Sequence, residues 1–133
     1  MEYKSYLNWA LNQASFTPKT YDRTHDVRFG GGLTIEASSA PEFLGRATLP
    51  NPEELFVASI ASCLMLTFLY IAATKGLTLS AYQSESTGKL AKNAEGKLAV
   101  IEVMVRPTLQ FSGEVPSQSL LHDLFEKAHA QCF

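Results

Sequence analysis

The sequence predicts an α+β fold in which two helices pack on antiparallel strands. A long uncharged helix occupies the middle of the chain, between an Asn-Pro-Glu-Glu start at residue 51 and a glycine at residue 76. A second helix with apolar residues on one face runs to Cys132. Short segments typical of strands, separated by turn residues, lie on both sides of the central helix. A chain of 133 residues favours one domain, residues 1–133, with a single core.

The first third of the chain predicts a small group of strands. Three consecutive glycines lie between two segments that favour extended backbone, which is typical of a hairpin turn. Pro41 and Gly45 interrupt the segment that follows, where apolar positions have no regular period. The expected elements are strands over residues 2–10, 21–29 and 33–37, a turn over residues 30–32, and a loop over residues 38–49.

The central helix has the clearest start signal in the sequence. Asn51 can cap it, Pro52 suits the first turn, and Glu53 and Glu54 lie where the helix dipole favours negative charge. From Leu55 to Thr74 no residue carries a formal charge, a length that matches a bilayer span. Small and hydroxyl residues within this segment, and the absence of a second such segment, favour a soluble protein over a membrane span.

A helix that is apolar nearly all round must be buried on nearly all sides. Its two dozen residues extend about 36 Å, close to the diameter of a domain of this size. Because one small subunit cannot easily cover every face, we expect an intertwined homodimer in which helix packs against helix.

The last part of the chain predicts a long hairpin and a second helix. Leu121, Phe125, Ala128 and Cys132 have the spacing of one helix face, so Cys132 should point toward the core, as Cys63 does. The expected elements are a strand over residues 77–87 that extends or bends through 89–92, a turn over 93–96, a strand over 98–111 partly confined to an edge by Pro107, and a helix from 116–117 to 132.

Composition and charge exclude several classes of function. With a net charge of −2 and no basic cluster, the chain has no electrostatic feature for binding nucleic acid or an anionic membrane. Two cysteines far apart in sequence form neither a disulfide framework nor a zinc knuckle. The N-terminal segment lacks the basic and apolar regions of a signal peptide. We therefore expect a cytoplasmic protein whose thiols are redox-active or catalytic.

Cys63 lies at the middle of the uncharged helix, on one stripe with Ser59 and Thr67. It is either an inert core residue between hydroxyls that bond back to helix carbonyls, or a nucleophile. A reactive thiol needs a nearby cation, and none lies near the helix centre, so the cation must come from another element. The available arginines are Arg23, Arg28, Arg46 and Arg106. Glu53 or Glu54 could orient such an arginine, or both could simply support the helix start.

The histidines leave one alternative open. His129 precedes Cys132 by three residues, but no second close ligand pair accompanies it, so we expect no metal. A cysteine hydrolase would use Cys63 to attack an acyl group, with His25 or His129 as base. The position of Cys63 within a helix, without a nucleophile-elbow turn, makes this the second choice. A non-catalytic dimeric binding module with inert thiols is a further alternative.

The segment NPEELFVASIASCLMLTFLYIAATKG, followed by KAHAQCF near the end, resembles the family of osmotically inducible protein C and organic hydroperoxide resistance proteins (OsmC/Ohr), and looks most similar to its OsmC-like branch. The hairpin RTHDVRFGGGLTIEASS falls in the order that the family has. The resemblance implies a thiol peroxidase: Cys63 matches the peroxidatic cysteine that becomes a sulfenic acid, and Cys132 the resolving cysteine that forms a disulfide with it. No cofactor is implied. A dithiol such as a dihydrolipoyl group, possibly on a lipoylated protein, would restore both thiols.

By the same resemblance, Glu53 matches the acid that holds the catalytic arginine, and Arg23 falls at the position of that arginine, with Arg46 as the rival. Four large apolar neighbours suggest an alkyl or lipid hydroperoxide in preference to hydrogen peroxide. These expected substrate-binding residues are Phe56, Ile60, Leu64 and Phe68.

Glu53 and Cys63 are separated by about 15 Å along a straight helix. We therefore predict a composite site at the dimer interface, with these groups drawn from two subunits. The chain departs from the family pattern after the second cysteine: Phe133 replaces a proline, and the family's final strand is absent from the sequence.

Overall fold

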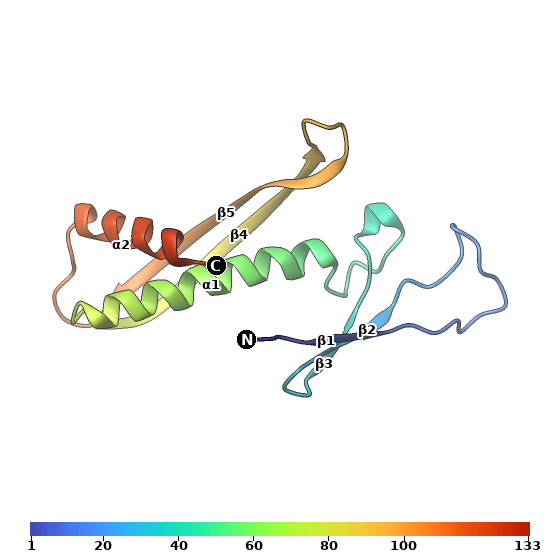
Figure 1. Cartoon of the computed structure of the whole chain (residues 1–133), viewed down its shortest axis with the longest axis horizontal. Coiled ribbons are helices and arrows are strands. Elements are labelled where there is room, and N and C mark those ends of the chain that lie inside the picture. The colour runs from blue at the N-terminus through green and yellow to red at the C-terminus, as the bar shows by residue number, and fades with distance from the viewer. The chain divides into compact units, whose positions relative to one another are not determined.

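A computed structural model describes all of residues 1–133 as two compact units, Met1–Leu55 and Phe56–Phe133. Each unit is described here by itself. The predicted α+β class is confirmed, because both units contain antiparallel strands and one long helix follows each sheet in the chain (Figure 1). The prediction of one single domain over the whole chain stays a prediction.

The first unit is built on a three-stranded antiparallel sheet in the order β1-β2-β3. Its strands are β1 (Ser5–Asn8), β2 (His25–Phe29) and β3 (Thr34–Ala37). The predicted glycine turn joins β2 to β3: the Phe29 amide donates to the Leu33 carbonyl at 2.8 Å, and Gly32 has a φ of 95°, which glycine adopts without strain. Val27 and Ala37 form the buried apolar face of this sheet.

Two predicted strands are shorter in the structure, and the predicted loop contains a short helix. Residues 21–24 do not join β2, because the Thr24 amide binds the Asp22 carboxylate in a local turn. The 3₁₀ turn η1 (Pro41–Phe43) lies in the segment predicted as loop, and it starts at the proline that marked that segment as irregular.

Helix α1 (Pro52–Thr74) confirms the predicted central helix and both of its end signals. Asn51 and Glu54 form a reciprocal capping box, in which each side chain accepts from the other residue's backbone amide. At the other end Gly76 has a φ of 75°, and the Leu77 amide donates to the Ala72 carbonyl. The division between the two units falls inside this helix, after Leu55.

The second unit combines most of α1 with a long hairpin and the last helix. Strands β4 (Leu79–Lys92) and β5 (Leu98–Phe111) form a two-stranded antiparallel sheet, and α2 (Gln118–Gln131) follows with Ser117 as its N-cap. A side chain at Gly88 of β4 would meet Val57 of α1 at 2.6 Å, so the absence of a Cβ there permits the close approach of helix and strand.

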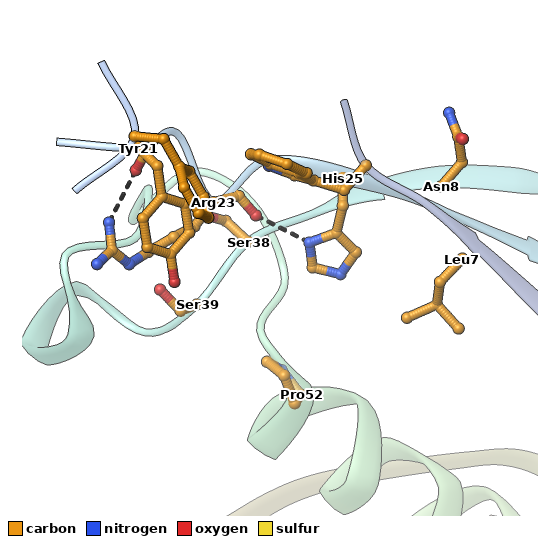
Figure 2. Close-up of a pocket in the computed structure, with 10 residues that line it drawn as sticks. Leu7, Asn8, Tyr21, Arg23, His25, Ser38, Ser39 and Pro52 are labelled. Atoms are coloured by element: carbon orange, nitrogen blue, oxygen red, sulfur yellow. Dashed lines mark hydrogen bonds between the residues drawn. The ribbon is translucent and has the colours of Figure 1, made fainter. Parts of the chain in front are cut away.

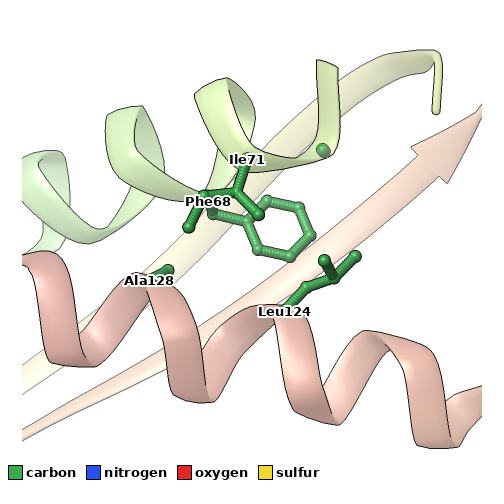
Figure 3. Packing of buried hydrophobic residues seen from close by; sticks show 5 residues of the cluster. Phe68, Ile71, Leu124 and Ala128 are labelled. Carbon is green, nitrogen blue, oxygen red and sulfur yellow. The ribbon is translucent and has the colours of Figure 1, made fainter. Parts of the chain in front are cut away.

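The core of this unit lies where α1 meets α2. Phe68 and Ile71 of α1 point toward Leu124 and Ala128 of α2 (Figure 3). The Phe68 ring also stacks on Phe125 with centroids 4.1 Å apart. The face of α2 predicted from sequence is therefore the face that packs inward.

Helix α1 is long and apolar enough to cross a membrane by length and composition alone, a test that the core helix of a soluble protein also passes. Its buried residues are Phe68, Ile71 and Ala72. Phe56, Leu66 and Tyr70 of the same helix are 49%, 60% and 72% exposed. Within the second unit, the long apolar helix is thus covered on one side only.

Candidate functional site

Both cysteines lie in the second unit, and the structure brings them together. Cys63 is in the middle of α1, and Cys132 is the C-cap of α2, one turn beyond buried Ala128. Both are half-buried and free of any disulfide. The packing of Leu124 and Ala128 against α1 fixes how the end of α2 meets the middle of α1.

The two thiols are electrostatically coupled. The pKa of Cys132 is raised to about 11, first by its hydrogen bond to Cys63, then by burial, and then by the negative charge of a Cys63 thiolate. A thiol that donates a hydrogen bond to a neighbouring thiolate resists losing its own proton.

Ser59 and Thr67 are the hydroxyl residues on the same helix stripe as Cys63, and Ser59 forms a hydrogen bond within the helix. Ser59 donates to the Phe56 carbonyl at 2.8 Å, as expected for a hydroxyl that bonds back to its own helix. No side-chain hydrogen bond joins a histidine to either thiol. His129 is exposed, and only its backbone carbonyl accepts from the Cys132 amide, at 3.3 Å.

The two acids at the start of α1 have different environments. Glu54 is exposed and completes the capping box with Asn51. Glu53 is half-buried, and its Oε2 atom is buried without any hydrogen-bond partner in the chain. A buried carboxylate oxygen without a partner is costly, so Glu53 is the acid suited to bind a cationic group.

The two candidate arginines also differ, although both belong to the first unit. Arg46 donates to the Asp22 carboxylate at 2.8 Å, and its charge is therefore already paired. The Thr24 amide, followed by Arg46, holds the pKa of Asp22 below its usual range. Arg23 has no acidic partner: it donates to the backbone carbonyls of Tyr21 at 2.8 Å and Pro18 at 2.6 Å.

Arg23 lines a pocket of about 540 Å³ in the first unit (Figure 2). Its guanidinium lies 4.1 Å from the centre of the Tyr21 ring. Pro52, the residue before Glu53, is part of the same wall. The complete lining consists of Leu7, Asn8, Trp9, Phe16, Tyr21, Arg23, His25, Ser38, Ser39 and Pro52.

His25 is fixed at this pocket by the hydrogen bond between its Nδ1 and the Arg23 carbonyl, at 2.8 Å (Figure 2). A carbonyl oxygen can only accept, so Nδ1 carries the proton and Nε2 of the neutral ring has the free lone pair. The same hydrogen bond ties the backbone of Arg23 to the start of β2.

The predicted substrate-binding residues of α1 have unequal exposure. Phe68 has no exposed surface and Leu64 packs against the core, whereas Ile60 is half-buried and Phe56 is half-exposed. Their role stays a prediction. The residues that the sequence did not indicate are Trp9, Phe16 and Tyr21 of the pocket; the one available signal was the concentration of aromatic residues near the N-terminus.

The thiols and the Arg23 pocket belong to different units, each of which is described alone. Arg23 and Glu53 lie in the first unit, and Cys63 and Cys132 in the second. The continuous helix between Glu53 and Cys63 keeps the predicted separation of about 15 Å along its axis. A composite site that uses groups of two subunits stays a prediction.

Comparison with known proteins identifies relatives over the whole chain. A sequence model of the family described as OsmC-like protein matches residues 45–133. A solved OsmC-like protein of unknown function from Vibrio cholerae is 36% identical, with a TM-score of 0.95 over 100% of this chain and 90% of that one. The search of curated proteins gave no match.

Two solved structures of organic hydroperoxide resistance proteins share the fold at lower identity. The protein from Elizabethkingia anophelis is 17% identical, with a TM-score of 0.71 over 99% of this chain and 84% of that one. The protein from Bacillus subtilis is 18% identical, with a TM-score of 0.64 over 99% and 86%. Below 25% identity these two show a common fold.

Proposed function

Because this chain belongs to the OsmC family, we propose that it is a thiol-dependent peroxidase that reduces organic hydroperoxides to alcohols. The observation that carries the proposal is the pair of free, half-buried cysteines, which lie close enough for Cys63 to raise the pKa of Cys132 to about 11. In such a pair one thiol can attack the peroxide, while the other stays protonated until it forms the disulfide. The structural neighbours named as organic hydroperoxide resistance proteins support the substrate class.

In the proposed reaction the Cys63 thiolate attacks the distal oxygen of the hydroperoxide. The O–O bond breaks, the sulfur becomes a sulfenic acid, and the alkoxide takes a proton from water and leaves as the alcohol. Cys132 then attacks the sulfenic sulfur, which forms the Cys63–Cys132 disulfide and releases water. A dithiol, for which we propose a dihydrolipoyl group, reduces the disulfide by two thiol–disulfide exchanges. The cycle requires a reducing compartment, consistent with a cytoplasmic protein.

Arg23 and Glu53 are the proposed charged partners of this reaction. Arg23 has no acidic partner, and Glu53 has a buried oxygen without a hydrogen-bond partner. A guanidinium held by Glu53 would favour the Cys63 thiolate and stabilise the charge on the leaving oxygen. The pairing of Arg46 with Asp22 makes Arg46 the weaker candidate.

We also propose that the active form is a homodimer. The support is the exposed apolar side of α1, where Leu66 and Tyr70 are 60% and 72% exposed in one protomer. Sedimentation equilibrium should give twice the chain mass, and Leu66→Asp should shift the protein toward monomer. A monomer at all concentrations would contradict this part of the proposal.

The function is tested by hydroperoxide consumption with reduced lipoate as electron donor. The parent protein should turn over cumene hydroperoxide repeatedly, and Cys63→Ser should lower consumption to the uncatalysed background. Cys132→Ser should permit oxidation of Cys63 but not disulfide formation, so that catalytic cycling with the dithiol is impaired. Peroxide consumption that is unchanged in Cys63→Ser would refute the assignment.

A further inference from the structure

The first unit contains an aromatic pocket that the thiol chemistry by itself does not require. The segment between β1 and β2 is closed by the Trp9 indole, which donates to the Asp22 carbonyl at 2.7 Å. Within it, the Trp9, Phe16 and Tyr21 rings contact one another, with centroids 5.4 to 6.1 Å apart in tilted and edge-on arrangements. These three residues are called the aromatic trio below.

Contacts among the aromatic trio leave much of the surface of these side chains exposed. Phe16 is 66% exposed and Trp9 41% exposed, although each lies in the ring cluster. All three line the pocket of about 540 Å³, a volume in the range of small-molecule sites. The pocket thus offers ring faces and edges to a small organic group.

Charge in this pocket is of one sign. Arg23 and His25 are its only titratable lining residues besides Tyr21, and no acid lines it. The acids Asp22, Asp26 and Glu36 instead line an adjoining polar cavity of about 260 Å³, together with Arg46. The two cavities share Asn8, Trp9 and His25. An occupant with an apolar body and an oxygen that accepts from a guanidinium matches the aromatic pocket, whereas a cationic occupant does not.

We propose that the aromatic trio binds the organic group of the hydroperoxide and selects an aryl ring over a saturated group of the same size. This proposal rests on the proposed function, since it assigns the substrate's organic group to the pocket that contains Arg23. Aromatic pairs gain from tilted and stacked contacts beyond the area that they bury. The gain corresponds to about a three- to tenfold preference for the aryl compound.

The pocket offers a direct measurement of occupancy, because Trp9 is the only tryptophan in the chain. The probes are two unreactive tertiary alcohols with the same head group: 2-phenyl-2-propanol, the alcohol formed from cumene hydroperoxide, and 2-cyclohexyl-2-propanol, in which the ring is saturated. Both should change Trp9 fluorescence, and the phenyl compound should bind about three- to tenfold more tightly.

Phe16→Leu keeps an apolar side chain and removes one ring, so it should reduce the phenyl preference toward unity. Phe43→Leu is the control, because Phe43 is also an exposed phenylalanine, at 43% against 66% for Phe16, but lies in η1 and does not line the pocket. The same loss should appear as a lower ratio of kcat/KM for cumene hydroperoxide over tert-butyl hydroperoxide in Phe16→Leu alone.

The outcomes separate this proposal from the proposed function. Equal affinity for the two alcohols, or no change in Trp9 fluorescence with either, would overturn the aryl selection even if the protein reduces peroxides. Selective binding of the phenyl alcohol without any peroxide reduction would instead overturn the proposed function and leave the aryl pocket standing.

Discussion

The two units of the chain carry different parts of the proposed chemistry. The second unit has the apolar core and both thiols, and no cation is among the causes that shift the pKa of Cys132. The first unit has little buried apolar surface, but it contains an arginine without an acidic partner, a carboxylate with a buried unpartnered oxygen, and an aromatic pocket. The thiols are therefore separated along the chain from the charged groups and the aromatic pocket, and substitutions in the two units should have different consequences.

The largest expected effect on stability is in the core of the second unit. Phe68→Ala removes a fully buried ring that stacks on Phe125, and should lower the free energy of unfolding by about 3–5 kcal/mol. Phe16→Ala in the first unit removes a ring that is 66% exposed and should cost much less. Denaturant unfolding of both variants makes the comparison. Equal destabilisation would show that the aromatic trio is a core and not a binding surface.

Among substitutions that leave both thiols in place, the largest effect on the rate is expected at Arg23. Arg23→Ala removes the cation proposed to stabilise developing negative charge, and should lower kcat/KM for cumene hydroperoxide by about 10²–10³-fold. Arg46→Ala is the control, since Arg46 is paired with Asp22, and should leave kcat/KM nearly unchanged. A larger loss of kcat/KM in Arg46→Ala than in Arg23→Ala would transfer the proposed role to Arg46.

Substitution of the two adjacent acids at the start of α1 should change kcat/KM less, but the two variants should differ clearly from each other. Glu53→Gln removes the charge of the buried, unpartnered carboxylate and should lower kcat/KM by about 10–100-fold, as for other residues that position a reacting group. Glu54→Gln alters only the capping box, so a slightly lower Tm with an unchanged rate is expected. Restoration of the rate by Glu53→Asp would distinguish a positioning role from a structural one, whereas equal rates in both glutamine variants would remove Glu53 from the mechanism.

The smallest of these effects concerns the proton on Cys132. In the parent protein this thiol stays protonated as pH rises, until the pH approaches its pKa of about 11. Because the hydrogen bond to Cys63 is the main cause, Cys63→Ala should lower the Cys132 pKa from about 11 toward its ordinary value of 9.0, with burial retaining part of the difference. Ultraviolet absorbance of the thiolate as a function of pH measures this, and a pKa that stays at about 11 would mean that burial alone sets it.

The fold was largely predictable because its signals are local. The Asn51–Glu54 capping box, Gly76 at the helix end and Ser117 before α2 lie where the structure starts or ends its helices. The meeting of Cys63 with Cys132 was also expected, because the family resemblance implies a disulfide between them and Cys132 was predicted to point toward the core. Only element lengths differed: the Asp22 turn shortens β2, and a local turn at Pro41 forms η1.

The environment of the site could not be predicted from the sequence, because it depends on contacts between residues that are distant in the chain. Nothing in the pair Glu53-Glu54 indicates that one carboxylate caps the helix while the other keeps a buried unpartnered oxygen. Trp9 and Tyr21 of the aromatic trio lie near opposite ends of the long connection between β1 and β2, so no periodic pattern in the sequence links them. The ion pair that sets Arg46 apart from Arg23 joins residues 24 positions apart.

The most direct test of the account is the stoichiometry of thiol loss. Reduced protein, freed of external thiol, is treated with less than one equivalent of cumene hydroperoxide, and the remaining thiols are titrated under denaturing conditions. The account predicts that each peroxide consumed removes two thiols and produces one Cys63–Cys132 disulfide and one molecule of the alcohol. Thiols that remain intact while peroxide persists, or a loss that involves Cys132 but not Cys63, would contradict it.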